Sequence, residues 1–266
     1  MDDLGDKGMK LGLEWDYRSC EDIETQARRI KDHGFDATFL DLEIDRIDKI
    51  MNELAKNGIE CESYHAPFRG VNDMWIAGEA GEIMLQRICQ CVDDCKHYDV
   101  PVAVVHLSSG RTPPRMNDVG FERYDRLMEH ADKKGVILAY ENVRRLDFLS
   151  YALENYPKAG FCWDVGHEAC YYNGIELMPL FGKRIVSLHL HDNMAVYDGD
   201  EHMFPYDGVI DMDKAAKHLA LSPYSGSVML EVTPDSSGTK STEEFYQKAY
   251  DVASRFARTV ENYRKV

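Results

Sequence analysis

Short apolar runs alternate with amphipathic, helix-like stretches along the whole chain. A short apolar run predicts a buried strand, whereas apolar residues at helical spacing predict a helix that packs on one face. A helix stop such as Gly58 marks the end of one of these stretches. The predicted strands are residues 9–15, 37–43, 60–66, 101–107, 136–142, 159–165, 185–191 and 227–233. The predicted helices are residues 20–34, 44–58, 82–98, 121–135, 146–156, 174–184, 211–220 and 241–263.

Strict alternation of strand and helix predicts that successive strands pair in parallel through right-handed crossovers. Eight such units in 266 residues match a closed (β/α)8 barrel, the TIM barrel. An open, doubly wound sheet is the main alternative, but no glycine-rich phosphate-binding turn follows the first predicted strand. No linker-like stretch interrupts the series. We therefore expect one α/β domain over residues 1–266, with residues 1–8 as a disordered acidic end.

Potential metal ligands stand at the carboxyl ends of the last six predicted strands. They are His65, His106, Glu141, Asp164, His167, His189 and Glu231. In a TIM barrel the active site lies at the carboxyl ends of the strands, so residues far apart in the sequence become neighbours there. The pattern therefore predicts one site built from several strands.

Four of these residues come from the last four strands, which are neighbours around one half of the barrel. They are Glu141, Asp164, His189 and Glu231. Three carboxylates and one imidazole suit a divalent ion such as Mn²⁺, Zn²⁺, Co²⁺ or Mg²⁺. Without a cation, the clustered carboxylates would repel one another and their pKa values would rise. The sequence therefore predicts a divalent metal site.

The segments around these residues resemble those of a known superfamily. The most specific are HLHDN at 189–193 and DEHMFPYDGVIDM at 200–212, while ENV, DVGH and LEVT are weaker but occur in the same order. Together they resemble the xylose isomerase-like TIM barrels, which include sugar-phosphate isomerases and epimerases, inosose dehydratases and endonuclease IV. The resemblance implies that the four residues above bind the metal and that His167 contacts a substrate hydroxyl. It also implies a homo-oligomer, either a dimer or a tetramer.

In the isomerases and epimerases of this superfamily the metal polarises a sugar carbonyl, and a glutamate removes the proton from the neighbouring carbon. Glu141 and Glu231 lie on either side of the metal by strand order, so we assign them as the acid/base pair. The leading hypothesis is a metal-dependent sugar or sugar-phosphate isomerase or epimerase. An inosose-type dehydratase is an alternative, because its reaction begins with the same proton abstraction.

The sequence also resembles endonuclease IV, which binds three zinc ions through nine residues. Five further ligands would then join the four: His65, His106, His167, Asp200 and His202. Histidine-rich sites favour zinc, and a polynuclear cluster suits phosphodiester hydrolysis. A second or third metal and a zinc phosphodiesterase are therefore alternatives, whereas in sugar-active relatives His65 and His106 would contact substrate. His191 could follow His189 into the site, but we favour a role in orienting a ligand.

Loop arginines after the third to fifth strands could bind a phosphate or carboxylate on a small substrate. They are Arg69, Arg111, Arg115, Arg144 and Arg145. We expect Arg69 and Arg111 to contact the substrate, and Trp15 to stack on a sugar ring. Three acids at the ends of the first two strands are candidates to bind sugar hydroxyls: Glu14, Asp41 and Glu43.

Composition narrows the choice of partners. The formal net charge of −16 argues against nucleic acid, because binding to nucleic acid depends largely on neutralising phosphates. The chain has no run of eighteen apolar residues and begins without the features of a signal peptide, so we expect a cytoplasmic protein without a membrane span. The seven cysteines fit a reducing compartment. Cys91 and Cys95 share a helix face, where thiols are favoured over a small metal site.

Overall fold

A computed structural model describes residues 8–41 and 46–265 of the chain. Glu43 and residues 1–7 of the expected acidic end lie outside the described residues. The strands are β1 (Leu11–Leu13), β2 (Ala37–Asp41), β3 (Glu60–His65), β4 (Val102–Val105), β5 (Ile137–Glu141), β6 (Gly160–Asp164), β7 (Ile185–His189) and β8 (Val228–Leu230). The α-helices are α1 (Ile23–Asp32), α2 (Ile47–Asn57), α3 (Glu79–His97), α4 (Asp118–Lys134), α5 (Leu146–Asn155), α6 (Val165–Tyr171), α7 (Met178–Phe181), α8 (Met212–Ala220), α9 (Pro234–Ser237) and α10 (Thr242–Arg264). Two short 3₁₀ helices are η1 (Val71–Trp75) and η2 (Gly182–Arg184).

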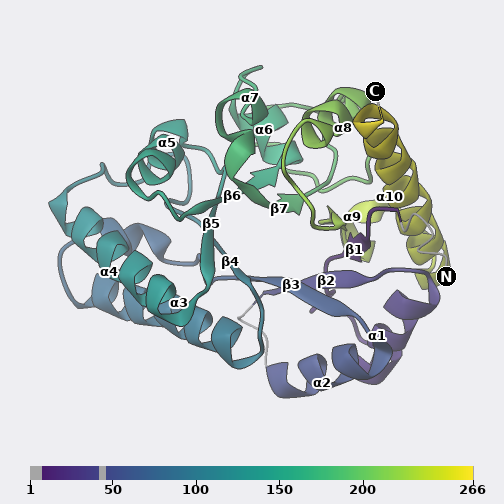
Figure 1. Cartoon of the computed structure of the whole chain (residues 1–266), viewed down its shortest axis with the longest axis horizontal. Helices are drawn as coiled ribbons and strands as arrows, with labels where there is room; N and C mark the ends of the chain where they lie inside the picture. Colours follow the sequence, from purple (N-terminus) through teal and green to yellow (C-terminus); the bar gives the residue numbers. More distant parts are fainter. Residues whose placement is uncertain (1–7, 42–45, 266) are drawn as a thin grey trace.

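The strands form one parallel sheet that curls into a barrel with helices around it (Figure 1). Their order is β7-β6-β5-β4-β3-β2-β1-β8. The two outer strands meet where Leu190 pairs with Leu230. There the Leu190 N–H donates to the Met229 carbonyl at 2.9 Å, and the Glu231 N–H donates to the Leu190 carbonyl at 3.1 Å. The predicted (β/α)8 barrel is confirmed.

Apolar side chains of the strands divide between the barrel interior and the layer beneath the helices. On β4, Val102 and Val104 belong to a small cluster inside the barrel, whereas Ala103 and Val105 belong to the large cluster against the helices. This is the alternation expected of a strand, whose successive side chains point to opposite faces. Both faces of each strand are therefore buried, as in other parallel barrels.

The main departure from the predicted elements is on the carboxyl side of β6. A helix was expected over residues 174–184, but α6 begins directly after Asp164, and only the short α7 and η2 occupy the predicted segment. Asp164 is the reason, because its carboxylate accepts a hydrogen bond from the His167 N–H at 2.6 Å and so caps the helix. A residue predicted only as a metal ligand also starts a helix.

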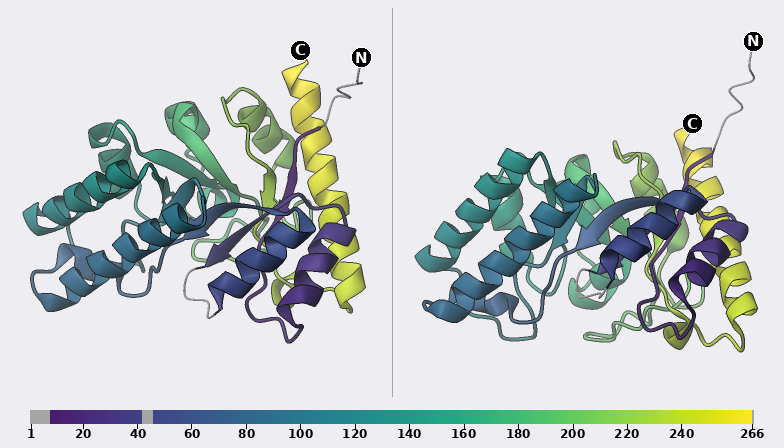
Figure 2. Two further views of the ribbon diagram at one scale, coloured as in Figure 1. Left: turned by 60° about the horizontal axis from the view of Figure 1, so that its bottom comes forward. Right: turned by 90° about the horizontal axis from the view of Figure 1, so that it is seen from below.

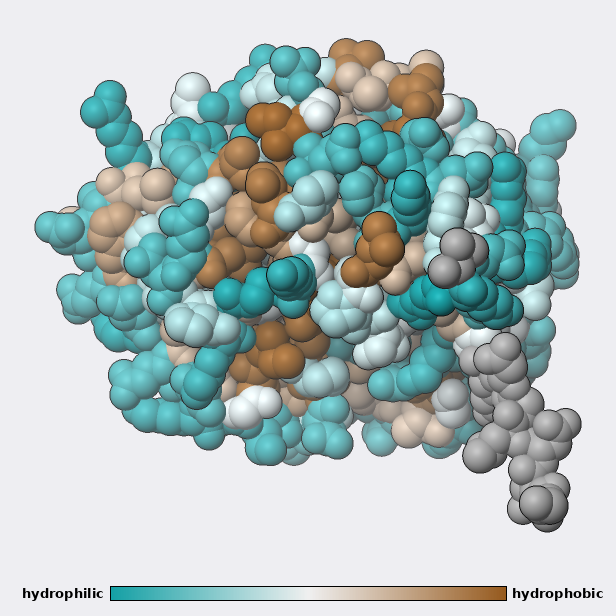
Figure 3. All heavy atoms as spheres, turned by 45° about the horizontal axis from the view of Figure 1, so that its top comes forward, coloured by the Kyte–Doolittle hydropathy of each residue, from teal (hydrophilic) through white to brown (hydrophobic). Residues whose placement is uncertain are grey.

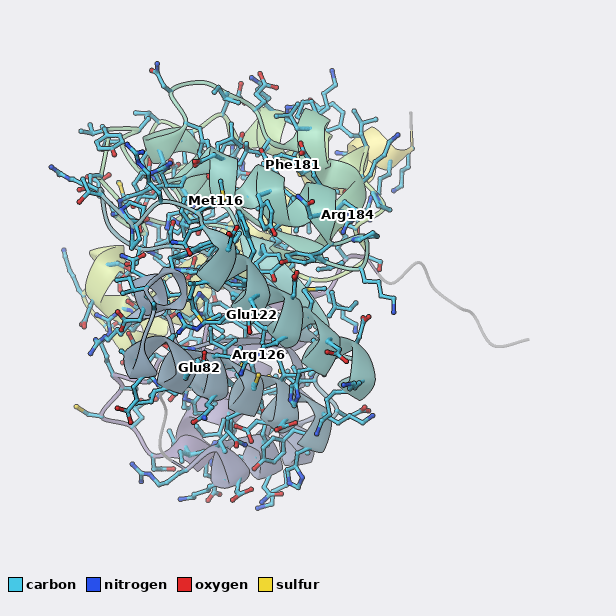
Figure 4. The ribbon with its side chains drawn as sticks, turned by 90° about the vertical axis from the view of Figure 1, so that its left-hand side faces the viewer. Glu82, Met116, Glu122, Arg126, Phe181 and Arg184 are labelled. Atoms are coloured by element: carbon cyan, nitrogen blue, oxygen red, sulfur yellow. The ribbon has the colours of Figure 1, made fainter. Side chains whose placement is uncertain are left out.

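The helices surround the barrel in both side views (Figure 2), with the long α10 packed against α8, β1 and β8. On the outer surface α3 and α4 lie side by side, and Arg126 of α4 pairs with Glu82 of α3 at 2.9 Å (Figure 4). Hydrophobic groups are interspersed among hydrophilic side chains on the face shown in Figure 3. No helix within the described residues is both long enough and apolar enough to span a membrane.

Candidate active site

The carboxyl ends of the strands open into a cavity of about 680 Å³. Most of the expected site residues line it: His65, Arg69, His106, Glu141, His167, Asp200, His202 and Glu231. Glu14 and Asp41, the candidates for binding sugar hydroxyls, line it too. Asp164 and His189 are fully buried, with 0% of each exposed, and both contact residues of the cavity wall. The structure thus brings together candidate ligands that are far apart in the sequence.

Glu141 lies at the centre of this cluster, at the end of β5. Its Oε2 lies 3.2 Å from Nε2 of His65 and 3.0 Å from Nε2 of His106. Its Oε1 lies 2.9 Å from Nδ1 of His167. Burial by itself would raise the pKa of Glu141, but the facing histidines, His106 above all, hold that pKa well below its ordinary value. Glu141 is therefore an ionised, buried carboxylate with both oxygens in use.

Asp164 is held at the end of β6 by the backbone and by a neighbouring amide. Besides capping α6, it exchanges two hydrogen bonds with Asn142: the Asn142 side-chain amide donates to the Asp164 carbonyl at 2.7 Å and accepts from the Asp164 N–H at 2.8 Å. His191 Nε2 lies 3.1 Å from Oδ1 of Asp164. The position of the carboxylate is therefore fixed before any ligand binds.

His189 and Glu231 form a close pair at the carboxyl ends of β7 and β8. The His189 ring stacks on Phe39 with centroids 4.7 Å apart, and its Nδ1 lies 3.3 Å from Oε2 of Glu231 and 3.8 Å from Oε2 of Glu141. Both ring nitrogens of His189 and Oε2 of Glu231 are buried without a well-aligned hydrogen bond, although Nδ1 and Oε2 lie close enough to form an ion pair. Unpaired buried polar atoms are costly, so their presence here points to a bound group. A divalent ion would satisfy them.

A second group of donors comes from the loop between β7 and α8. Oδ2 of Asp200 lies 3.0 Å from Nε2 of His167, and Oδ1 lies 3.4 Å from Nε2 of His202. The His202 ring stacks on His191 with centroids 4.1 Å apart. His191, which was expected to orient a ligand, therefore faces the site and lies 3.7 Å from Oδ1 of Asp200. His202 adopts a φ of +48°, which is uncommon for a residue other than glycine.

The donor atoms form several overlapping groups within the described residues, each with donors no more than 4.8 Å apart. One group is Asp164, His189 and Glu231, beside which Glu141 supplies the fourth predicted ligand. Two further groups are His65, His106 and Glu141, and His191, Asp200 and His202. Carboxylate and imidazole together are suitable ligands for Mn²⁺, Co²⁺ or Zn²⁺. The residues present therefore fit a divalent ion, with donors for more than one.

Asp192 holds the loop that carries the second group of donors, a role that the sequence analysis did not assign. It is fully buried, and its carboxylate accepts hydrogen bonds at 2.8–3.1 Å from four backbone N–H groups, those of Asn193, Tyr206, Gly208 and Ile210. A Cβ atom at position 208 would lie 2.3 Å from Oδ1 of Asp192, so the close approach requires glycine there. The signal in the sequence is the acidic residue in HLHDN followed by the turn YDG, but its partners depend on the loop conformation.

Two expected substrate contacts do not lie in the cavity wall. Trp15 is 3% exposed and packs in the hydrophobic core. It follows Glu14, which lines the cavity, so alternation of side chains turns Trp15 toward the helices. The expected contact of Trp15 with substrate is therefore wrong. Arg111 is also absent from the wall: its side chain is 68% exposed, and its Nε donates to Oδ2 of Asp198 at 2.6 Å.

Other residues belong to the site although the sequence analysis did not select them. Cys162 forms a donor group with Glu141 and His189, and its place two residues before Asp164 puts it on the same face of β6. Arg144 lines the cavity, but choosing it among the loop arginines requires the loop conformation. Cys91 and Cys95 are buried elsewhere in the core and belong to none of the donor groups of the described residues.

Comparisons with known proteins place the chain in a family. A family model described as "Xylose isomerase-like TIM barrel" matches residues 27–253. Among curated proteins, an uncharacterised protein, y4fM, of Sinorhizobium fredii is 27% identical over 154 residues, which are 54% of this chain. The match spans about half (48%) of that relative's length.

Several solved structures share the fold. A D-tagatose 3-epimerase-like protein superposes with a TM-score of 0.74 at 20% identity, covering 96% of this chain and 99% of that chain. A 3-keto-D-glucoside 4-epimerase from E. coli gives a TM-score of 0.74 at 17% identity, covering 93% and 99% of the two chains. D-psicose 3-epimerase from Clostridium cellulolyticum H10 gives 0.74 at 16% identity, covering 95% and 99%.

Proposed function

The chain belongs to the xylose isomerase-like TIM barrel family, and on this premise we propose that it is a metal-dependent sugar isomerase or epimerase that removes a proton next to a carbonyl group. The observation that carries the proposal is the buried donor set of Glu141, Asp164, His189 and Glu231, with its unpaired ring nitrogens and carboxylate oxygen. The epimerases among the structural relatives act on keto sugars by name, which supports a keto sugar as substrate.

A divalent ion in this donor set would polarise the substrate carbonyl and acidify the neighbouring C–H group. Glu231 is suited to accept that proton, because it lines the cavity and the neighbouring His189 favours its ionised form. Glu141 lies on the other side of His189, whose Nδ1 is 3.8 Å from Glu141 and 3.3 Å from Glu231. A proton returned to the same carbon from the opposite face gives an epimer. A proton returned to the adjacent carbon gives an isomer.

Incorporation of solvent deuterium into the substrate tests this proposal. The metal-loaded protein is incubated in D₂O with a panel of ketoses, phosphorylated ketoses and an inosose, and label is located by NMR. We expect label at the carbon next to the carbonyl of at least one ketose. No label in any member of the panel would contradict proton abstraction.

The same experiment separates an epimerase or isomerase from an inosose-type dehydratase. Both would exchange the proton, but the dehydratase would also release water and give an unsaturated or dicarbonyl product. The NMR spectra of the products distinguish these outcomes.

A zinc phosphodiesterase is a second candidate, and a specific observation favours it. The donor groups around His65 and His106, and around Asp200 and His202, lie beside the four-residue set and could hold further ions. A polynuclear zinc site suits phosphodiester hydrolysis. Three zinc ions per chain by elemental analysis, together with hydrolysis of bis(p-nitrophenyl) phosphate, would support this candidate over the isomerase.

A further inference from the structure

We infer that Asp198 makes the cavity selective for an uncharged sugar over its phosphate ester, because its carboxylate pairs with Arg144, the arginine of the cavity wall that would otherwise bind the phosphate. The inference rests on the proposed function and names the substrate class of the same site. Asp198 lies on the loop between β7 and α8, two residues before Asp200.

The carboxylate of Asp198 joins two arginines from different loops at the mouth of the cavity. Nε of Arg144 donates to Oδ1 at 2.7 Å, and Nε of Arg111 donates to Oδ2 at 2.6 Å. A second nitrogen of each guanidinium lies 2.6 Å from the same oxygen. Both carboxylate oxygens are therefore engaged, and each guanidinium presents two nitrogens to Asp198 rather than to the cavity.

Arg144 is the arginine that matters for the substrate, because it lines the cavity. Its Cζ lies 4.5 Å from the centre of the Tyr171 ring, and Tyr171 in turn contacts Tyr197, which precedes Asp198. Stacking on an aromatic face holds a guanidinium in place independently of its ion pairs. Arg144 should therefore stay at the mouth when the Asp198 carboxylate is removed.

Acidic side chains also outnumber arginines in the wall of the cavity. Among the described residues that line it, seven are aspartate or glutamate and three are arginine. Of the other two arginines, Arg18 faces Asp235 at 4.0 Å, and Arg69 also has a partner in the protein.

A substrate phosphate would have to displace Asp198 to form a bidentate pair with Nε and Nη2 of Arg144, the two nitrogens that Asp198 holds. The loop keeps that carboxylate at an effective concentration on the order of millimolar or higher, so the competition favours the protein's own acid. The hydroxyl groups of an uncharged sugar do not need to compete with Asp198 for Arg144. They can bind to the carboxylates that dominate the wall.

Binding of a matched pair of unreactive probes tests the inference separately from catalysis. Ribitol and ribitol 5-phosphate are titrated by calorimetry into the Mn²⁺-loaded protein. We expect wild type to bind ribitol at least as tightly as its phosphate. In Asp198→Asn, the affinity ratio should shift toward the phosphate by about tenfold or more, the factor that corresponds to ~1.4 kcal/mol.

Two further variants identify the cause of any shift. Asp207→Asn removes a carboxylate from the same loop, but its partner Lys248 does not line the cavity, so the ratio should stay as in wild type. Adding Arg144→Gln to Asp198→Asn should return the ratio to the wild-type value. A wild type that prefers the phosphate by tenfold, an unchanged ratio in Asp198→Asn, or binding of neither probe would overturn the inference. Failure of the proposed function would be seen separately, as absence of deuterium exchange in the ketose panel.

Discussion

Glu141 and Glu231 have the same side chain, but the two carboxylates differ in their contacts and in their access to the cavity. Glu141 is 2% exposed and is contacted by three histidines. Glu231 lines the cavity, and its Oε2 lies 3.3 Å from Nδ1 of His189, which lowers the pKa of Glu231 although burial by itself would raise it. A general base must be ionised to accept a proton, and Glu231 meets that condition.

Replacing Glu231 by glutamine should therefore remove most of the activity. We expect Glu231→Gln to lower the rate of deuterium exchange by roughly 10²- to 10⁴-fold at saturating Mn²⁺, since a positioned base contributes about that factor. Glu201→Gln is the matched control, because Glu201 also lines the cavity but belongs to none of the donor groups of the described residues. Equal losses in the two variants would show that Glu231 has no special role.

At the residue scale, sequence reasoning could find the strand-end ligands because a TIM barrel gathers those positions whatever the loops do. It could not find Asn142, whose side chain positions Asp164 through two hydrogen bonds with the Asp164 backbone. It also could not separate Arg144, in the cavity wall, from Arg111, outside it. That choice depends on Asp198, whose position is set by a loop with several residues at positive φ.

The loop between β7 and α8 is organised by one buried acid. Asp192 has four backbone N–H donors and lies beside the chain segment that supplies Asp200 and His202. Each carboxylate oxygen accepts two of these hydrogen bonds. A neutral amide can present only one oxygen, so its NH₂ group would face two N–H donors.

Asp192→Asn should therefore loosen this loop. We expect a loss of about 1–3 kcal/mol in the free energy of unfolding, the cost of leaving buried polar groups unsatisfied. Hydrogen exchange measured by mass spectrometry should be faster in peptides containing Tyr206, Gly208 and Ile210, with smaller changes in α3 and α4. Asp207→Asn again serves as the control. Unchanged protection of the loop peptides in Asp192→Asn would refute the organising role.

At the element scale, the order and type of strands and helices followed from hydrophobic spacing, but their ends did not. The helix after β6 was placed about two and a half turns too late in the chain, because the pattern gave no weight to Asp164 as a cap. Helix caps depend on a single hydrogen bond, such as the one to the His167 N–H, and such bonds are not encoded in hydrophobic periodicity.

The fold of the whole barrel brings charged side chains from different strands together. Glu141, Asp164 and Glu231 place three carboxylates around His189. A cation in this donor set binds the folded chain, whereas the unfolded chain does not gather the ligands. Binding that is confined to the folded state raises stability in proportion to the logarithm of ligand concentration.

The metal-free protein should accordingly melt at a higher temperature when Mn²⁺ is added. At 100 times the dissociation constant the gain is ~2.7 kcal/mol, which for a domain of this size corresponds to about 5–10 °C. Differential scanning calorimetry measures the shift, and Asp164→Asn should show a much smaller one. An equal shift in that variant would place the ion outside the proposed donor set.

At the scale of the molecule, the fold was the most predictable feature. Eight repeats of strand and helix allow few topologies. In a closed parallel barrel every strand has a hydrogen-bonded neighbour on each side. The closing contact between Leu190 and Leu230 follows from that topology. The number of bound ions does not follow from the topology, because it depends on distances of a few ångströms between donor groups.

Deuterium exchange during metal titration tests the central claim most directly. Metal-free protein is titrated with Mn²⁺ in D₂O, with the ketose that exchanges fastest, while bound metal is measured in parallel. We predict that exchange is absent without metal, rises with the first ion bound per chain, and is nearly abolished in Glu231→Gln even when the metal is bound. Full exchange by the metal-free protein, or by the metal-loaded Glu231→Gln variant, would contradict the account.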